Sequence, residues 1–134
     1  MVNSMIDITK MQRNTVILIE TVNAVYEIKV TGPKSCTIEI QGGKRFVRPT
    51  KAILNGSFED SDAHEKELQK GMINWAESMD ISYKINKITH SISTADVLSA
   101  RIYAPDGSWN YEVWDDAHPD ISGAVQEAKA RNKR

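Results

Sequence analysis

Residues 25 to 46, VYEIKVTGPKSCTIEIQGGKRF, decide the fold, because apolar and polar residues alternate in two separate runs within them. A β-strand has a side-chain period of two, so VYEIKV (25–30) and CTIEIQ (36–41) each predict a half-buried strand. The residues expected to face inward are Tyr26, Ile28, Val30, Cys36, Ile38 and Ile40. Gly32-Pro33 indicates a turn between the runs, and Gly42-Gly43, which tolerates positive φ, indicates a hairpin after the second.

Further strands are predicted on both sides of this stretch. On its N-terminal side, TVILIE (15–20) is a β-branched run that is too short for an independent helix. On its C-terminal side, residues 45–54 continue extended, and Pro49 within them suits an edge or a bend. The remaining predicted strands are residues 79–86, 88–93, 97–103 and 108–114. The last two are expected to form a hairpin around the turn tripeptide PDG.

Two segments break this pattern. Residues 58–71 are predicted to be an acidic loop or a short helix, since Asp62 followed by Glu65 resembles a capping box. Residues 120–134 are predicted to be a C-terminal helix with a basic tail. Its narrow apolar stripe, which includes Val125, is expected to dock on the sheet.

The predicted fold class is therefore mainly β (α+β). We expect a small, strongly bent antiparallel sheet or a partly open barrel of about seven or eight strands. A C-terminal helix and a possible short middle helix complete it. A chain of 134 residues is most simply one domain, which here covers residues 1–134 with residues 1–14 as a lead-in.

Composition narrows the class of protein. Hydrophobic residues make up 40% and charged residues 26% of the chain, and the formal net charge is -1, so no overall attraction to nucleic acid or anionic lipid is expected. The single cysteine, Cys36, excludes an internal disulfide and a cysteine zinc site, and it suits a reducing cytoplasm. Without a long apolar run or a signal peptide, we expect a soluble cytoplasmic protein that does not contact membranes.

Residues 15 to 57 carry a family resemblance. The runs TVILIETVNAVYEIKV and IEIQGGKRFVRPTKAILNGS are similar to the opening of a group of small uncharacterised bacterial proteins. The matching positions are Asn23, Tyr26, Val30, Gly42, Gly43, Phe46, Gly56 and Ser57. The resemblance, which MDISYKINKITHSIST extends, implies a β-rich fold and no particular activity.

The acidic stretch after the last predicted strand is a candidate metal site. Its possible ligands to a divalent ion are Asp115, Asp116, His118 and Asp120. The spacing lacks the glycine and the final glutamate of an EF-hand loop. The favoured alternative is a strand end, a turn at Pro119 and a helix cap.

The aromatic residues before this stretch divide between two faces of the predicted strand. Trp109, Tyr111 and Val113 alternate onto one face, and Trp114 lies on the other. If the second face is solvent-exposed, Trp114 is a candidate interface anchor. The alternative is that the C-terminal helix covers it.

The segment from Lys29 to Lys51 is a candidate anion site. It holds six cations against one acid, Glu39, a local net charge of +5. The hairpin tip QGGKRF combines backbone amides with Lys44, Arg45, Phe46 and nearby Arg48, and could hold a phosphate or stack a base. A solvated basic face, balanced by acids in residues 59–67, is the alternative.

No catalytic motif is evident, because the chain has no nucleophile elbow, phosphate loop or dinucleotide fingerprint. His90 lies between Ile88 and Ile92 on one strand face and is expected to be a core histidine.

We therefore expect a non-enzymatic binding or assembly module without a cofactor. It would act through a sheet edge or an exposed aromatic face, on a protein partner or a second copy. The alternatives are nucleic-acid or phosphate binding through residues 42–51 and a metal-dependent enzyme built on residues 115–120.

Overall fold

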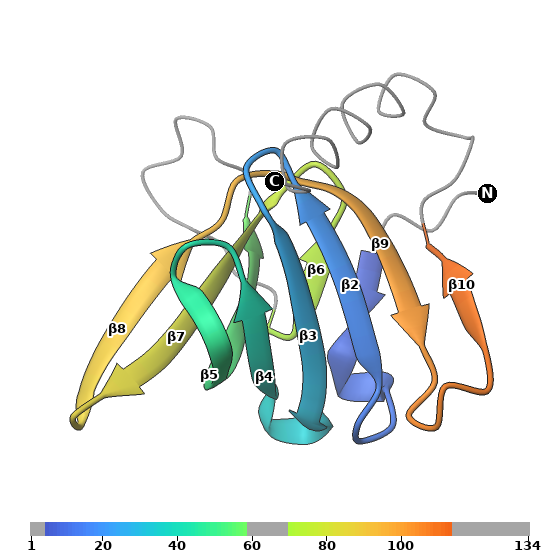
Figure 1. Ribbon diagram of the computed structural model, residues 1–134, viewed down its shortest axis with the longest axis horizontal. Coiled ribbons are helices and arrows are strands. Elements are labelled where there is room, and N and C mark those ends of the chain that lie inside the picture. The colour runs from blue at the N-terminus through green and yellow to red at the C-terminus, as the bar shows by residue number, and fades with distance from the viewer. Residues whose placement is uncertain (1–4, 59–69, 114–134) are drawn as a thin grey trace.

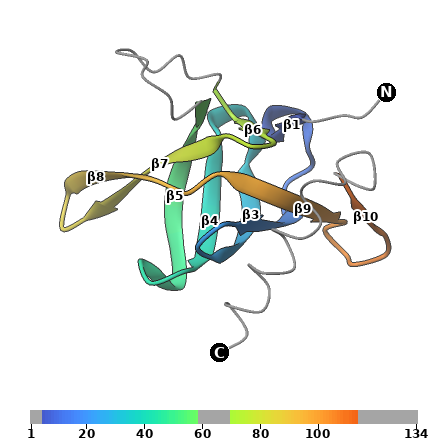
Figure 2. The same ribbon diagram turned by 90° about the horizontal axis from the view of Figure 1, so that it is seen from above.

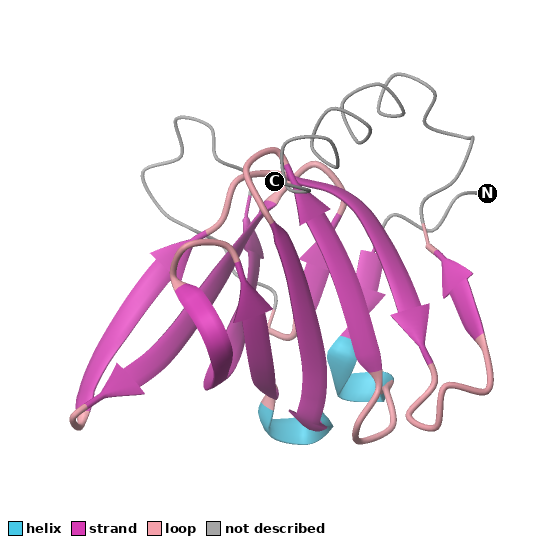
Figure 3. Ribbon diagram, viewed as in Figure 1, coloured by secondary structure: helices cyan, strands magenta, loops and turns pink. Residues whose placement is uncertain are grey.

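The computed structural model describes residues 5–58 and 70–113, most of which form β-strands (Figures 1 and 3). The strands of this part are β1 (Met5–Asp7), β2 (Val16–Thr21), β3 (Val25–Gly32), β4 (Thr37–Gly42), β5 (Phe46–Phe58), β6 (Met72–Asn74), β7 (Ser78–Ile85), β8 (Ile88–Ser93), β9 (Val97–Tyr103) and β10 (Asn110–Glu112). Two single-turn 3-10 helices, η1 (Ile8–Lys10) and η2 (Pro33–Ser35), connect strands. Neither of these helices is long and apolar enough to cross a membrane.

Eight of these strands form one antiparallel sheet in the order β10-β9-β2-β3-β4-β5-β7-β8. The edge strands β8 and β10 lie at opposite sides of the molecule in both views, so the sheet is not closed into a barrel (Figures 1 and 2). β1 and β6 pair separately as a small second sheet. The prediction of a mainly β fold with an antiparallel sheet of about eight strands is thus confirmed.

The long strand β5 bends the sheet, because it changes partner along its length. Its first part pairs with β4, and its second part, from Ala52 onward, pairs with β7. The register shifts on both sides, near Gly42 and near Gly56, as β-bulges require. Pro49 lies in the stretch of β5 between Phe46 and Thr50 that has no partner in the β4 register, as expected for a proline at a bend.

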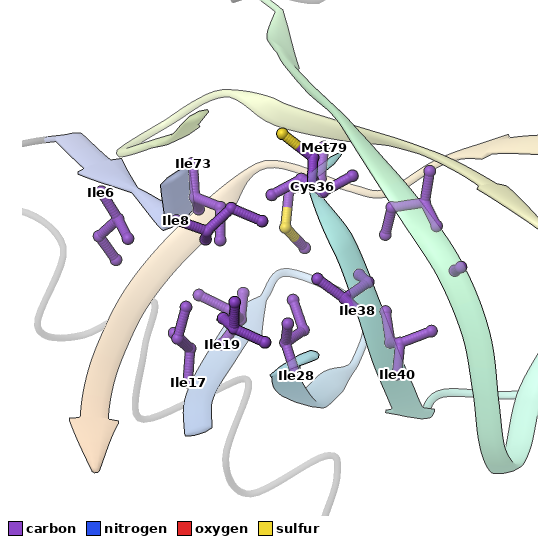
Figure 4. Close-up of a cluster of buried hydrophobic side chains, with 14 of the residues drawn as sticks. Ile6, Ile8, Ile17, Ile19, Ile28, Cys36, Ile38, Ile40, Ile73 and Met79 are labelled. Carbon is purple, nitrogen blue, oxygen red and sulfur yellow. The ribbon is translucent and has the colours of Figure 1, made fainter. Parts of the chain in front are cut away.

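One face of the sheet carries the core. The fully buried side chains of this face come from five neighbouring strands, and Figure 4 shows many of them pointing toward one another: Ile17, Ile19, Ile28, Val30, Ile38, Ile40, Leu54, Met79 and Ile81. Burying each such side chain contributes roughly 1.5–3 kcal/mol. The strand alternation expected from the sequence therefore identifies the main source of stability.

Residues 5–10, which lie within the predicted lead-in, cover this core. β1 and β6 place Ile6 and Ile73 over the apolar face, and η1 adds the fully buried Ile8. Asp7 caps η1 by accepting a hydrogen bond from the Thr9 backbone N–H at 3.0 Å. Strands of three residues are too short to show a period of two, so β1 and β6 have no signal in the alternation pattern.

The predicted helices lie outside the described residues. Residues 59–69 of the 58–71 segment, predicted as an acidic loop or a short helix, are not described, and neither is any part of the C-terminal helix predicted at residues 120–134. Both stay predictions. In the described part of the chain, Phe58 ends β5 and Gly71 precedes β6.

Candidate binding surfaces

The predicted glycine hairpin is confirmed between β4 and β5. Gly42 and Gly43 have φ angles of 135° and 63°, in the region that L side chains rarely adopt. A Cβ on Gly42 would lie 2.1 Å from the Val25 carbonyl oxygen, and one on Gly43 would lie 3.3 Å from the Tyr26 hydroxyl. The loop is thus held tightly against β3, which fixes the direction in which the following residues leave it.

Phe46 leaves this loop toward the core and not toward solvent. Its side chain is only 1% exposed, and its ring packs edge-on against Tyr83, with 5.2 Å between ring centroids. An edge-to-face contact of this kind stabilises a buried aromatic pair. Phe46 therefore supports the hairpin from below and offers no surface on which a base could stack.

Arg45 is positioned above this aromatic pair. Its Nη1 atom donates a hydrogen bond to the Tyr83 hydroxyl at 3.2 Å, while the residue stays exposed. Burial raises the pKa of the Tyr26 phenol, and the positive charge of Arg45 opposes that shift. The guanidinium therefore lies close to two phenols. Among the described residues, no carboxylate forms an ion pair with Arg45.

Tyr83 also contacts a histidine. The His90 ring stacks on Tyr83, with 5.5 Å between centroids and 22° between planes. His90 is half-buried and lies on the edge strand β8, so its prediction as a core histidine is wrong. We call Tyr26, Arg45, Phe46, Tyr83 and His90 the Arg45 cluster.

The other cations of the predicted basic stretch are spread over the molecule. On the outer face of the sheet, Lys29 lies opposite Glu39 in the β3–β4 register, and Glu39 lies opposite Lys51 in the β4–β5 register. Opposite charges alternate there, as on an ordinary solvated face. Lys34 belongs to η2, at the other end of β4 from the glycine loop. Only Lys44, Arg45 and Arg48, all exposed, stay near that loop.

The two edges of the sheet differ in length and charge. β10 has three residues, and Arg101 of β9 both forms a hydrogen bond with Asn110 at 2.8 Å and approaches Glu112 at 3.9 Å. β8 has six residues, Ile-Thr-His-Ser-Ile-Ser, with no lysine, acid or proline. Natural edge strands usually carry such residues, or are short, because they prevent pairing with other chains. β10 fits that description and β8 does not.

The backbone N–H and C=O groups of successive β8 residues point alternately toward β7 and toward the open edge of the sheet. Asn86 and Lys87 have positive φ angles, 51° and 70°, as in a two-residue hairpin turn. In such a turn the flanking residues, here Ile85 and Ile88, form a hydrogen-bonded pair. The Thr94 N–H donates to Met79 O at 3.0 Å, as expected if every second residue from Ile88 onward bonds toward β7. The backbone groups of Thr89 and Ser91 therefore point away from β7.

Apolar side chains line one face of this edge. Ile88 is 62% exposed and Ile85 is 50% exposed, although both lie on the face of the sheet that carries the core. Ile92, farther along the same face, is partly buried against the core. The β7–β8 hairpin therefore extends the apolar face of the sheet beyond the part that the core fills.

A second exposed aromatic surface lies at the other side of the sheet. Trp109 and Tyr111 stack with 5.7 Å between centroids and are 48% and 50% exposed. Alternation places both on one face of the predicted strand, and Tyr111 lies opposite the core residue Ile102. A groove beside Tyr111 is lined by Ile6, Met11 and Val113. The pair is exposed because β10 is an edge strand, whose position could not be read from alternation.

Several predicted site residues lie outside the described residues. These are Trp114 and the candidate metal ligands Asp115, Asp116, His118 and Asp120. Within residues 5–58 and 70–113, no three histidine, cysteine, aspartate or glutamate side chains are grouped as a metal site would require. The expected inward position of Cys36 is confirmed, since the thiol is fully buried.

Sequence reasoning placed Arg45 correctly at the hairpin tip but missed its partners. Tyr83 is 38 residues away, and only the pairing of β5 with β7 brings it to Arg45. The β8 edge did have a signal, which is the uncharged run ITHSIS between two turn-forming segments. No family model matches the sequence, and no curated protein or solved structure shows significant similarity to it.

Proposed function

We propose that the protein is a non-enzymatic binding module that accepts an extended strand at the β8 edge. Strand addition uses the outward N–H and C=O groups of an edge strand for affinity and the alternate side chains for selectivity. The observation that carries the proposal is the composition of β8, six uncharged residues at the end of an open sheet. The exposed Ile85 and Ile88 would supply apolar contacts to the added strand.

A proline scan of the two edges tests this proposal. Ser91→Pro removes an N–H that points away from β7, so the β7–β8 hairpin keeps its backbone hydrogen bonds and loses only the exposed contact between the Ser91 and Ser82 hydroxyls at 3.3 Å. Glu112→Pro is the matched control, because the 2.9 Å bond from Val113 N–H to Ala100 O indicates that the Glu112 N–H points away from β9. Peptides selected from a random displayed library on the parent protein should bind Glu112→Pro and fail to bind Ser91→Pro. Equal binding to both variants would reject the β8 edge as the site.

A second candidate function is the binding of an anionic group by Arg45. The observation in its favour is that the guanidinium is held by the Tyr83 hydroxyl while no described carboxylate neutralises it. Lys44 and Arg48 add positive charge near the same loop. The geometry suits a phosphate, and loss of oligonucleotide binding in the double variant Lys44→Ala and Arg45→Ala tests it.

A further inference from the structure

We infer that the strand added at the β8 edge is β8 of a second copy of this chain, in an antiparallel pair with a two-fold axis through His90. This inference rests on the proposed function and names its partner. A two-fold interface uses the same patch on both copies, so the patch must be complementary to itself. β8, the edge strand at one side of the sheet (Figure 1), meets this condition in its backbone, its side chains and its flanking charges.

The outward backbone groups of β8 set the register. In an antiparallel pair, residues directly opposite each other lie on the same face, and outward-pointing residues exchange hydrogen bonds. With the axis at His90, Thr89 lies opposite Ser91 of the second copy, and each such pair exchanges two bonds. Shifting the axis to Ser91 would place Ile88 opposite Thr94, whose polar side chain is only 7% exposed and offers Ile88 no apolar surface. The register centred on His90 instead places Ile88 opposite the partly buried Ile92.

The side chains of that register are matched on both faces. On the apolar face, Ile88 lies opposite Ile92 of the second copy, so the most exposed isoleucine of the hairpin gains an apolar neighbour. On the other face, Thr89 and Ser91 present hydroxyls. They continue a polar row in which Asn55 donates to Ser82 at 2.7 Å and Ser82 lies 3.3 Å from Ser91. No charged side chain of β8 would lose its water.

The charges at the ends of β8 favour the antiparallel direction. Lys84 and Lys87 lie at the tip of the β7–β8 hairpin, and the exposed Asp96 follows the other end of β8. Antiparallel pairing brings each lysine tip to the acidic end of the second copy. Parallel pairing would place the two lysine tips side by side, where like charges repel.

Opposite charges introduced at the axis test the arrangement. His90 meets its own copy at the axis, so His90→Lys and His90→Glu should each make the protein monomeric. A mixture of the two variants in equal amounts should recover dimers. Sedimentation equilibrium of the parent, each variant and the mixture over a concentration series measures this, with circular dichroism to show that each is folded. A mixture that stays monomeric, while the parent forms dimers, would overturn the register.

Disulfide trapping is a second test, and it introduces no charged residue at position 90. His90→Cys should form a disulfide-linked dimer on mild oxidation, because residues opposite each other in a pair without hydrogen bonds lie within disulfide reach. The parent, whose Cys36 is buried, and Val47→Cys, at a position that is 72% exposed, are the controls and should stay mainly unlinked. Equal trapping of His90→Cys and Val47→Cys would contradict the axis.

The outcomes separate this inference from the proposed function. If the parent is monomeric at all concentrations but binds selected peptides in a way that Ser91→Pro abolishes, the second copy is wrong and the binding edge is correct. If the parent is monomeric and its peptide binding is unaffected by Ser91→Pro, both fail. Dimers that persist in Ser91→Pro and in both His90 variants would assign self-association to another surface and reject the inference.

Discussion

The Nη1 atom of Arg45 donates a 3.2 Å hydrogen bond to the hydroxyl of Tyr83, a residue 38 positions later in the chain. The bond joins the glycine hairpin of β4 and β5 to the β7–β8 hairpin. It also orients a guanidinium that stays exposed and has no ion pair with a described carboxylate. An oriented cation loses less conformational entropy on binding an anion than a mobile one does.

Removing the charges at the hairpin tip should abolish binding of phosphate groups. We expect the double variant Lys44→Ala and Arg45→Ala to lose any affinity of the parent for a single-stranded oligonucleotide at about 50 mM salt, where phosphate contacts are strongest. Fluorescence anisotropy with a labelled oligonucleotide measures this. Absence of binding by the parent under these conditions would end the proposal of an anion site.

Two variants separate the Arg45 cluster from general basic charge. Lys29→Ala removes a cation that lies opposite Glu39 on the outer face, and it should leave binding unchanged. Tyr83→Phe keeps the ring contact with Phe46 but removes the hydroxyl that accepts from Arg45. It should weaken binding without changing its salt dependence, because the number of charges is the same.

Cys36 should be unreactive in the folded protein. Its side chain is fully buried, and a Cβ on Gly71 would lie 2.9 Å from its Sγ atom, so the thiol has no access to solvent. A thiol reagent such as dithiobis(nitrobenzoate) should react only as fast as the protein opens, and reaction should accelerate strongly in denaturant. Rapid reaction in native buffer, at the rate of a small-molecule thiol, would contradict the burial of Cys36.

The same burial makes stability fall at high pH. Desolvation raises the pKa of the Cys36 thiol, the charge of Lys70 opposes the shift, and that of Asp7 adds to it. The folded state therefore favours the neutral thiol. Its stabilising contribution is complete below the ordinary thiol pKa of about 8.5 and is lost as pH rises from there through the folded-state pKa. Between pH 7 and pH 10, denaturant titrations should show a larger loss for the parent than for Cys36→Ala.

The large strands were predictable because each has enough residues to show alternation or a β-branched run. The 97–103 strand was predicted with the bounds of β9, and the strands at 79–86 and 88–93 within one residue of β7 and β8. The three-residue strands β1 and β6 were not predicted, because they carry no readable period. Their role is long-range, since Ile6 and Ile73 meet only in the folded chain.

The candidate site was less predictable, because exposure depends on where a strand lies in the sheet. Alternation placed Trp109 and Tyr111 on one face, where their rings do stack, yet both are about half exposed since β10 is at the edge. The same reason makes His90 half-buried and not a core residue. Phe46, by contrast, follows a loop glycine pair and could have pointed either way. Strand order, which is a property of the whole chain, decides these cases.

Ser57 should contribute measurably to stability. Its hydroxyl donates to Met72 O and accepts from Asn74 N–H, both at 2.9 Å, and so attaches β6 to the end of β5. Ser57→Ala leaves both backbone groups without these bonds, at a cost of about 1–3 kcal/mol. Ser35→Ala, which removes an exposed hydroxyl, is the control and should cost less. Equal denaturation midpoints for the two variants would contradict this role.

The glycine loop that positions Arg45 should tolerate no side chain at Gly42. Its φ of 135° lies in a region that alanine adopts only with strain, and its Cβ would lie 2.1 Å from the Val25 carbonyl oxygen. The obstacle is backbone of β3, which cannot move without breaking the pairing of β3 with β4. Gly107 also has a positive φ, 75°, but no atom lies within 4 Å of its Cβ position.

Comparing alanine at these two glycines separates steric overlap from backbone strain. Gly107→Ala should cost about 1–2 kcal/mol, the penalty of a left-handed conformation alone. Gly42→Ala should cost clearly more, because strand pairing must also be displaced, and thermal unfolding should show a much lower midpoint or no folded protein. Because the displaced loop carries Arg45, a folded Gly42→Ala protein should also lose the hydrogen bond to Tyr83 and, with it, affinity for anions. Similar midpoints for the two variants would show that the loop does not lie against β3 as described.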